Sequence, residues 1–91
     1  MLFNYKYTNS FKKDLKAIAK GNPKMIKRIE SIVEIIKKNP QDDSLHYEKI
    51  KGCKGLKLRY LVGMKYRILV EIEIKNNLII FKRVGQRENF Y

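Results

Sequence analysis

The chain has 91 residues, a length that predicts a single domain spanning residues 1–91 around one hydrophobic core. Its hydrophobic fraction of 44% and aromatic fraction of 11% exclude a disordered chain, and no apolar run approaches the roughly 20 residues of a membrane span. Lys and Arg total 21 against 9 Asp and Glu, and the formal net charge of +12 favours a polyanionic partner, either nucleic acid or an acidic protein surface.

A strand and two helices are predicted in the first half of the chain. The aromatic residues of Phe3–Tyr7 alternate with other side chains, a period of two that is typical of a strand. Helical periodicity then predicts one amphipathic helix that ends at Gly21. A second helix begins at Pro23, with Asn22 as its N-cap, and ends before Pro40. The short connection indicates an antiparallel helical hairpin.

The second half of the chain predicts a β-meander. Residues 41–55 form a polar segment, in which residues 47–51 are either loop or extended. Three strands follow, over Leu56–Leu61, Tyr66–Ile74 and Leu78–Val84, separated by turns at Val62–Lys65 and Asn76–Asn77. Strands joined by tight turns are antiparallel. The predicted class is therefore α+β: an N-terminal strand, a helical hairpin and a three-strand antiparallel meander, with both helices on one face of the sheet.

Basic residues of this meander are predicted to gather on one surface. If the apolar face of the strands packs on the helices, the opposite face carries Lys57, Arg59 and Arg67, with Arg83 and Arg87 at or beyond the last strand. Guanidinium groups bind phosphate in a directional, bidentate manner, and a tyrosine such as Tyr91 can stack on an unpaired base. A single cation on a sheet face is usually just solvated. A cluster with an aromatic residue beside it favours RNA binding.

The residues that could catalyse RNA cleavage are few. The reaction needs a base for the 2′-hydroxyl, an acid for the leaving oxygen and cations for the phosphorane charge. The one cysteine, Cys53, cannot form an internal disulfide, which fits a reducing cytoplasm, and with His46 as the one histidine no zinc site is expected. A metal-free mechanism is therefore favoured, without a cofactor. The base could be Glu48, His46 or a lysine whose pKa is lowered by neighbouring cations.

Four segments together carry a resemblance to a known family: Tyr47–Gly52, Leu56–Arg59, Gly63–Arg67 and Val84–Tyr91. They resemble the RelE/ParE toxin superfamily, which commonly shows a basic L-x-G segment, an R-x-G-x-Y-R segment and an ending of the type V-G-H-R-x-x-x-Y. The helix start at Phe11–Leu15 is also similar to the family's opening. The resemblance spans nearly the whole chain and agrees with the predicted order of elements.

The resemblance implies a toxin of a type II toxin–antitoxin system, folded as a small antiparallel sheet with a helical hairpin. RelE-like members cut mRNA in the ribosomal A site without a metal, whereas ParE-like members poison DNA gyrase. Arg67 and Arg87 match family arginines that would hold the scissile phosphate, and Tyr91 matches the terminal tyrosine. Glu48 or a lysine such as Lys57 would activate the 2′-hydroxyl. The remaining cations expected to bind RNA phosphate are Arg59, Lys51, Arg83 and Lys54.

One departure from the family pattern keeps other functions open. Gln86 stands where the family frequently has histidine, so that acid or base is not available. Retention of Arg67, Arg87 and Tyr91 together favours an mRNA endoribonuclease that acts on the ribosome. The alternatives are a ParE-like gyrase inhibitor and a catalytically inactive RNA-binding member. The expected partners are a cognate antitoxin on a separate, acidic chain, together with the ribosome and mRNA; no membrane is expected.

Overall fold

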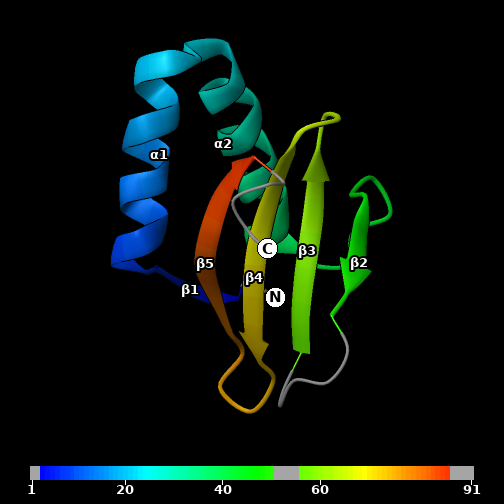
Figure 1. The fold of residues 1–91 in the computed structure, drawn as a ribbon. Coiled ribbons are helices and arrows are strands. Elements are labelled where there is room, and N and C mark those ends of the chain that lie inside the picture. The colour runs from blue at the N-terminus through cyan, green and yellow to red at the C-terminus, as the bar shows by residue number, and fades with distance from the viewer. Residues whose placement is uncertain (1–2, 51–55, 87–91) are drawn as a thin grey trace.

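A computed structural model describes residues 3–50 and 56–86, which form two helices and a five-stranded sheet (Figure 1). The spatial order of the strands is β1-β5-β4-β3-β2, so β1 and β2 form its edges. In chain order the elements are β1 (Asn4–Tyr7), α1 (Asn9–Gly21), α2 (Pro23–Lys38), β2 (Tyr47–Lys49), β3 (Leu56–Val62), β4 (Tyr66–Glu73) and β5 (Leu78–Gln86). The predicted α+β class and the antiparallel meander of β3, β4 and β5 are confirmed.

Two details of the sheet differ from the prediction. The sheet is mixed, because β1 pairs with β5 in parallel, with Tyr5 opposite Ile79. It also has a fifth strand, β2, which pairs antiparallel with β3 and packs the Tyr47 ring 5.5 Å from that of Tyr60. Three residues are too few for an alternating pattern, and for this reason the sequence left this segment undecided.

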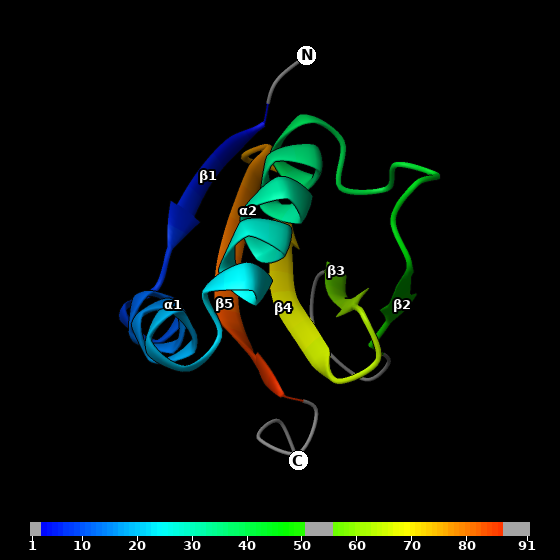
Figure 2. The same cartoon turned by 90° about the horizontal axis from the view of Figure 1, so that it is seen from above.

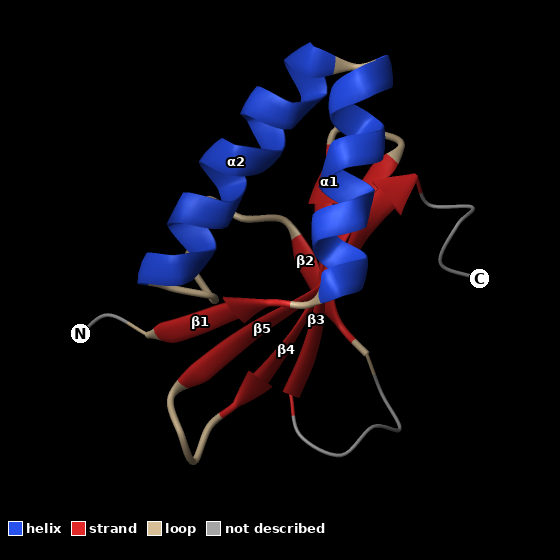
Figure 3. Cartoon of the chain, turned by 90° about the vertical axis from the view of Figure 1, so that its left-hand side faces the viewer, coloured by secondary structure: helices blue, strands red, loops and turns tan. Residues whose placement is uncertain are grey.

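The helices begin at the caps that the sequence offers. The Thr8 hydroxyl accepts a hydrogen bond of 3.1 Å from the Phe11 N–H at the start of α1. The Asn22 side chain accepts one of 3.2 Å from the Met25 N–H at the start of α2. Figure 3 shows both helices on the same side of the sheet, as predicted. No helix in the described ranges is both long and apolar enough to cross a bilayer.

The hydrophobic core lies between the helices and the sheet. Figure 2 shows α2 running across the sheet, while α1 lies beside β5. The fully buried residues include Phe11 of α1, Ile29 and Ile36 of α2, and Leu58, Tyr60, Ile68, Val70 and Phe81 of the strands. Every second residue of β3 and β4 faces this core, so the intervening residues lie on the opposite, helix-free face.

The turns fix the strand ends a residue or two from the predicted positions. Val62 is fully buried and belongs to β3, because the turn begins at Gly63, whose φ of +64° suits glycine. Ile74 is 74% exposed and lies in the next turn, where Asn77 has a φ of 51°. This left-handed angle agrees with the predicted Asn76–Asn77 turn.

Beyond the end of β1, Thr8 and α1 hydrogen-bond to the outer edge of β5. Thr8 donates its N–H to the Phe81 carbonyl at 3.1 Å and its hydroxyl to the Lys82 carbonyl at 2.8 Å. One turn into α1, Asp14 accepts the Val84 N–H at 3.0 Å. The ladder between β4 and β5 shifts register near Leu69 and Val70, and the extra residue on β5 is Lys82. These bonds hold the C-terminal half of β5 in place.

Candidate functional site

Three of the predicted basic residues lie on the helix-free face of the meander. Lys57 and Arg59 of β3 alternate with the buried Leu58 and Tyr60 and therefore point away from the core. Arg67 of β4 lies opposite Leu61 of β3, so it is a diagonal neighbour of Arg59 across the ladder. Diagonal neighbours of this kind are about 7–8 Å apart, within the reach of long side chains. The predicted clustering of basic residues thus holds for Arg59 and Arg67.

Arg67 is a buried arginine, and its hydrogen-bond partners among the described residues are backbone carbonyls. It is 8% exposed, and its Nη1 donates to the Tyr66 carbonyl at 2.8 Å and to the Met64 carbonyl at 3.5 Å. Within the described residues it forms no ion pair. Burial of a charge is costly unless the charge is paired or well hydrogen-bonded. The two carbonyls hold the guanidinium in place, and its charge is available for an anion.

Gly85 of β5 is the direct cross-strand partner of Arg67 of β4. The cross-strand position on this face of β5 therefore carries no side chain, and the arginine can lie close to the sheet. Sequence analysis did not single out Gly85, although a glycine inside a strand is a known signal of close approach by another group. Beside it, Gln86 is exposed and pairs with Tyr66, at the position where the family frequently has histidine.

Glu48 and Arg59 form an ion pair across β2 and β3. They are direct cross-strand partners, with Arg59 Nη2 at 2.6 Å and Nε at 2.7 Å from the same carboxylate oxygen, Oε1 of Glu48. The Glu48 side chain is 53% exposed, so the pair contributes little to stability. Two residues that the sequence analysis assigned to different roles are thus in direct contact.

Lys57 lies further along the same face. It is opposite Glu71 in the ladder, and Glu71 also lies 3.7 Å from Lys82 Nζ. Three residues of β3 separate Lys57 from Leu61, the residue opposite Arg67, a distance along the strand of about 13 Å. Lys57 and Arg67 therefore do not meet at one atom, although an extended strand of RNA could contact both.

Arg83 bonds to the helical hairpin. Its Nε donates to Asp14 Oδ2 at 2.8 Å and its Nη2 to Oδ1 at 3.3 Å. The hydrogen bond to Asp14 and the carboxylate charge raise the pKa of the Arg83 guanidinium. Its predicted contact with phosphate stays a prediction, and such a contact would compete with Asp14.

Four predicted site residues, Lys51, Lys54, Arg87 and Tyr91, lie outside the described residues. Their roles stay predictions, as do those of Glu48, Lys57, Arg59, Arg67 and Arg83. His46 is exposed and lies in the loop before β2, where its carbonyl accepts the N–H of Leu61, the residue opposite Arg67, at 2.8 Å. In the ranges 3–50 and 56–86, no three His, Cys, Asp or Glu side chains are grouped so that they could hold a metal ion.

The described residues form a small α+β protein with a basic helix-free face, and comparisons with known proteins identify its family. Residues 5–91 match the family described as ParE toxin of the type II toxin–antitoxin system, parDE. The chain belongs to this family, within the RelE/ParE superfamily, and is a toxin of a type II toxin–antitoxin system. No curated protein sequence matches it significantly.

Solved structures with the same fold include three toxins crystallised with antitoxins. RelE of the RelB–RelE complex from Methanococcus jannaschii is 33% identical, with a TM-score of 0.75 over 93% of each chain. The E. coli DinJ–YafQ complex gives 17% identity and a TM-score of 0.81 over 100% of this chain and 99% of that one. The archaeal RelE–RelB complex from Pyrococcus horikoshii OT3 gives 19% identity and a TM-score of 0.75 over 96% and 97%.

Proposed function

We propose that this toxin is a ribosome-dependent mRNA endoribonuclease that acts in the cytoplasm and inhibits translation. Arg67 and Arg87 hold the scissile phosphate and stabilise the charge that develops on it during cleavage. Tyr91 stacks on a base or assists proton transfer, and Glu48 or Lys57 activates the 2′-hydroxyl. Arg59, Lys51, Lys54 and Arg83 contact the RNA backbone. The reaction uses no cofactor.

The observation that carries this proposal is the setting of Arg67. Its guanidinium is buried, bonded to two backbone carbonyls and free of any carboxylate partner among the described residues. A fixed cation of this kind loses little freedom when phosphate arrives, and it acts in a site of lowered dielectric constant. Arg59 lies diagonally beside it and can guide the RNA backbone.

Primer extension in a reconstituted translation system tests this function. The purified toxin is added with and without ribosomes, and mRNA 5′ ends are mapped. Cuts at A-site codons that require ribosomes support the proposal, and Arg67→Ala should reduce their rate by at least about 10²-fold while the thermal unfolding temperature changes little. Full activity of Arg67→Ala refutes the role of this arginine. Cuts in naked RNA would indicate a free ribonuclease instead.

Inhibition of DNA gyrase is the second candidate function, and the description of the matched family as ParE toxin favours it. A supercoiling assay with purified gyrase separates the two candidates. Inhibition of supercoiling together with intact mRNA would replace the nuclease proposal. In both cases the partner is a cognate antitoxin on a separate chain, as in the RelB–RelE and DinJ–YafQ complexes. An acidic antitoxin segment would neutralise part of the toxin's charge of +12.

A further inference from the structure

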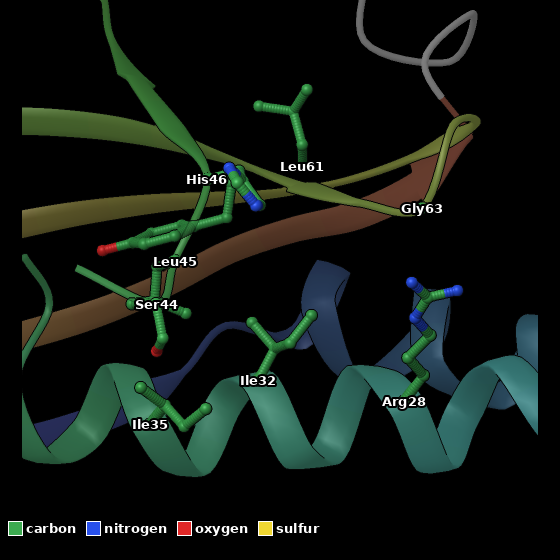
Figure 4. A pocket seen from close by; sticks show the side chains of 9 residues that line it. Arg28, Ile32, Ile35, Ser44, Leu45, His46, Leu61 and Gly63 are labelled. Carbon is green, nitrogen blue, oxygen red and sulfur yellow. The ribbon is translucent and has the colours of Figure 1, made fainter. Parts of the chain in front are cut away.

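Two cavities flank the helical hairpin, and their linings differ in character. The cavity in Figure 4 lies beside α2, where Ile32 and Ile35 give it an apolar wall. The other lies between α1 and the adjoining ends of β4 and β5, and its lining includes Ala17, Tyr66 and Gln86. We call it the α1–β5 cavity. Its volume of about 460 Å³ falls in the range of about 300–1,000 Å³ that is typical of small-ligand sites.

Strand alternation directs the side chains of Tyr66 and Gln86 toward the α1–β5 cavity. Val84 is buried in the core on the helix side of the sheet, so Gln86, two residues further along β5, points to the same side. Tyr66 is the cross-strand partner of Gln86 and packs partly against the core. Gly85 and Arg67 form the next pair of the ladder. The cavity therefore begins one residue from the candidate site, on the other side of the sheet.

Hydrogen-bonding groups in the α1–β5 cavity lack protein partners in the described ranges. The Tyr66 hydroxyl and the Gln86 side-chain amide form no hydrogen bond with any described residue. Asn22 uses its side-chain oxygen to accept the Met25 N–H at 3.2 Å, which leaves its NH₂ group for a ligand. A glutamine amide offers donors and an acceptor side by side, the arrangement that pairs with N6 and N7 of adenine.

The ring of Tyr66 supplies a surface for stacking. No other described aromatic ring lies against it. Proteins commonly hold unpaired RNA bases by stacking them on aromatic side chains, because every base has a π-face. Ala17 and Ile18 of α1 line the cavity as well, and Ala17 is small and exposed. The helix therefore leaves room for a flat group beside the ring.

The charge of the α1–β5 cavity suits a neutral group. Asp14 lines it, but Oδ2 of this carboxylate accepts from Arg83 Nε at 2.8 Å and from the Val84 N–H at 3.0 Å. The guanidinium thus balances the carboxylate charge before a ligand arrives. The other described residues of the lining carry no charge. A nucleobase matches such a polar, neutral cavity, whereas a phosphate matches the cation of Arg67.

We propose that the α1–β5 cavity holds one unpaired base of the message, next to the phosphate that Arg67 binds. The base stacks on Tyr66, and its edge pairs with the Gln86 amide, which favours adenine. The source of the base rests on the proposed function. Gln86 is then a specificity-determining residue.

The geometry lets one nucleotide occupy both places. Arg67 Nη1 donates to the Tyr66 carbonyl at 2.8 Å, so the residue that stacks on the base also positions the guanidinium. Cα atoms of cross-strand partners such as Arg67 and Gly85 are about 4.5–5.5 Å apart. Because β4 begins at Tyr66 and β5 ends at Gln86, a nucleotide at this end of the sheet reaches both of its sides.

A nuclear magnetic resonance titration with adenosine 5′-monophosphate (AMP) tests the cavity without catalysis. AMP should shift the signals of the Gln86 side-chain amide and the Ala17 methyl group. Gln86→Ala removes the pairing group and Ala17→Phe fills the cavity, so each should weaken AMP binding by about tenfold or more. Ala19→Phe is the matched control, because Ala19 is exposed on the same helix outside this lining, and it should weaken binding by less than about twofold. No shifts at millimolar AMP, or equal losses in the two Phe variants, would overturn the proposal.

Mapping of cleavage sites tests the source of the base. In the reconstituted translation system, with a message that contains every codon, the wild type should prefer adenine beside the cut. Gln86→Ala should lose most of this preference while total cleavage falls by less than about threefold. AMP binding together with an unchanged base preference would overturn the assignment to the message. A wild-type chain without nuclease activity would remove the proposed function, whereas the AMP titration would still test the cavity.

Discussion

Arg67 and Gly85 face each other across the ladder between β4 and β5, and the buried arginine has a neighbour without a side chain. The guanidinium bonds to the Tyr66 carbonyl at 2.8 Å, which sets its position relative to the sheet. Tyr66 belongs to the same strand as Arg67, whereas Gly85 belongs to β5 and is its cross-strand partner. If Arg67 holds the scissile phosphate as proposed, this pairing makes Gly85 a second residue to test.

A side chain at position 85 should displace the guanidinium. Gly85→Val places a branched side chain opposite Arg67, and a shift of about 1 Å in a positioning group can lower a rate about 10²-fold. We expect ribosome-dependent cleavage to fall by this order while circular dichroism stays unchanged. Gly21→Ala is the matched control, because an added methyl group there meets nothing within 4 Å. Wild-type cleavage by Gly85→Val would show that the glycine has no such role.

The catalytic role proposed for Glu48 can be tested separately from its effect on the stability of the fold. Its ion pair with Arg59 is exposed, so Glu48→Gln should change the free energy of unfolding by less than about 1 kcal/mol. If Glu48 is the general base, the same variant should lower the cleavage rate by about 10²–10⁴-fold. Urea denaturation and primer extension on one protein preparation measure both quantities. An unchanged cleavage rate would leave Lys57 and His46 as described candidates for the base.

Asp14 should stabilise the closed edge of β5. Asp14→Ala removes the acceptor for the Val84 N–H and for Arg83, and a lost buried hydrogen bond costs about 1–3 kcal/mol. Asp14→Asn keeps an acceptor oxygen and should lose less. Thermal unfolding of both variants measures the difference. Equal losses would mean that the carboxylate charge, and not the bond to Val84, makes the contribution.

Tyr60 should make the fold sensitive to alkali. Its hydroxyl is buried and donates to the Pro40 carbonyl at 2.7 Å, and burial raises the pKa of Tyr60 above its usual value. Below about pH 10, the pKa of a tyrosine in an unfolded chain, the Tyr60 hydroxyl is protonated in both states and adds no pH dependence to the free energy of unfolding. Above that pH the unfolded chain releases the proton first, so the free energy of unfolding falls by up to about 1.4 kcal/mol per pH unit.

Comparison with Tyr60→Phe isolates this effect. The variant should be less stable at pH 7 by about 1–3 kcal/mol, because the Pro40 carbonyl loses its partner. Between pH 10 and 11.5 its stability should fall less steeply than that of the wild type, since the titrating group is gone. Urea titrations across this range give both values. Parallel curves for the two proteins would show that Tyr60 titrates normally in the fold.

Much of the fold follows from local patterns. Phe11, Ile29 and Ile36 lie on the apolar faces of the helices, Leu58 and Tyr60 alternate with polar residues, and Asn22 caps α2 as predicted. The parallel pairing of β1 with β5 does not follow from such patterns, because Tyr5 and Ile79 are far apart in sequence. Neither does β2, whose three residues become a strand through bonding to β3.

Part of the candidate site was predictable because it also depends on local sequence patterns. Alternation along β3 and β4 places Arg59 and Arg67 on one face, since side-chain direction in a strand is local. The contact of Glu48 with Arg59 and that of Arg83 with Asp14 depend on pairings between distant segments. Gly85 was missed because its pairing with Arg67 is visible only in the folded chain.

The parallel pairing of β1 with β5 also governs when this protein can fold. β5 is the last of the described strands in chain order, yet it lies between β1 and β4 and carries the buried Ile79 and Phe81. Until β5 is synthesised, β1 has no strand to pair with and the core lacks these two side chains. The hydrogen bond from Val84 of β5 to Asp14 of α1 cannot form either. A contact between such distant segments forms late and slowly. The sheet of this toxin is therefore complete only after β5 has left the ribosome.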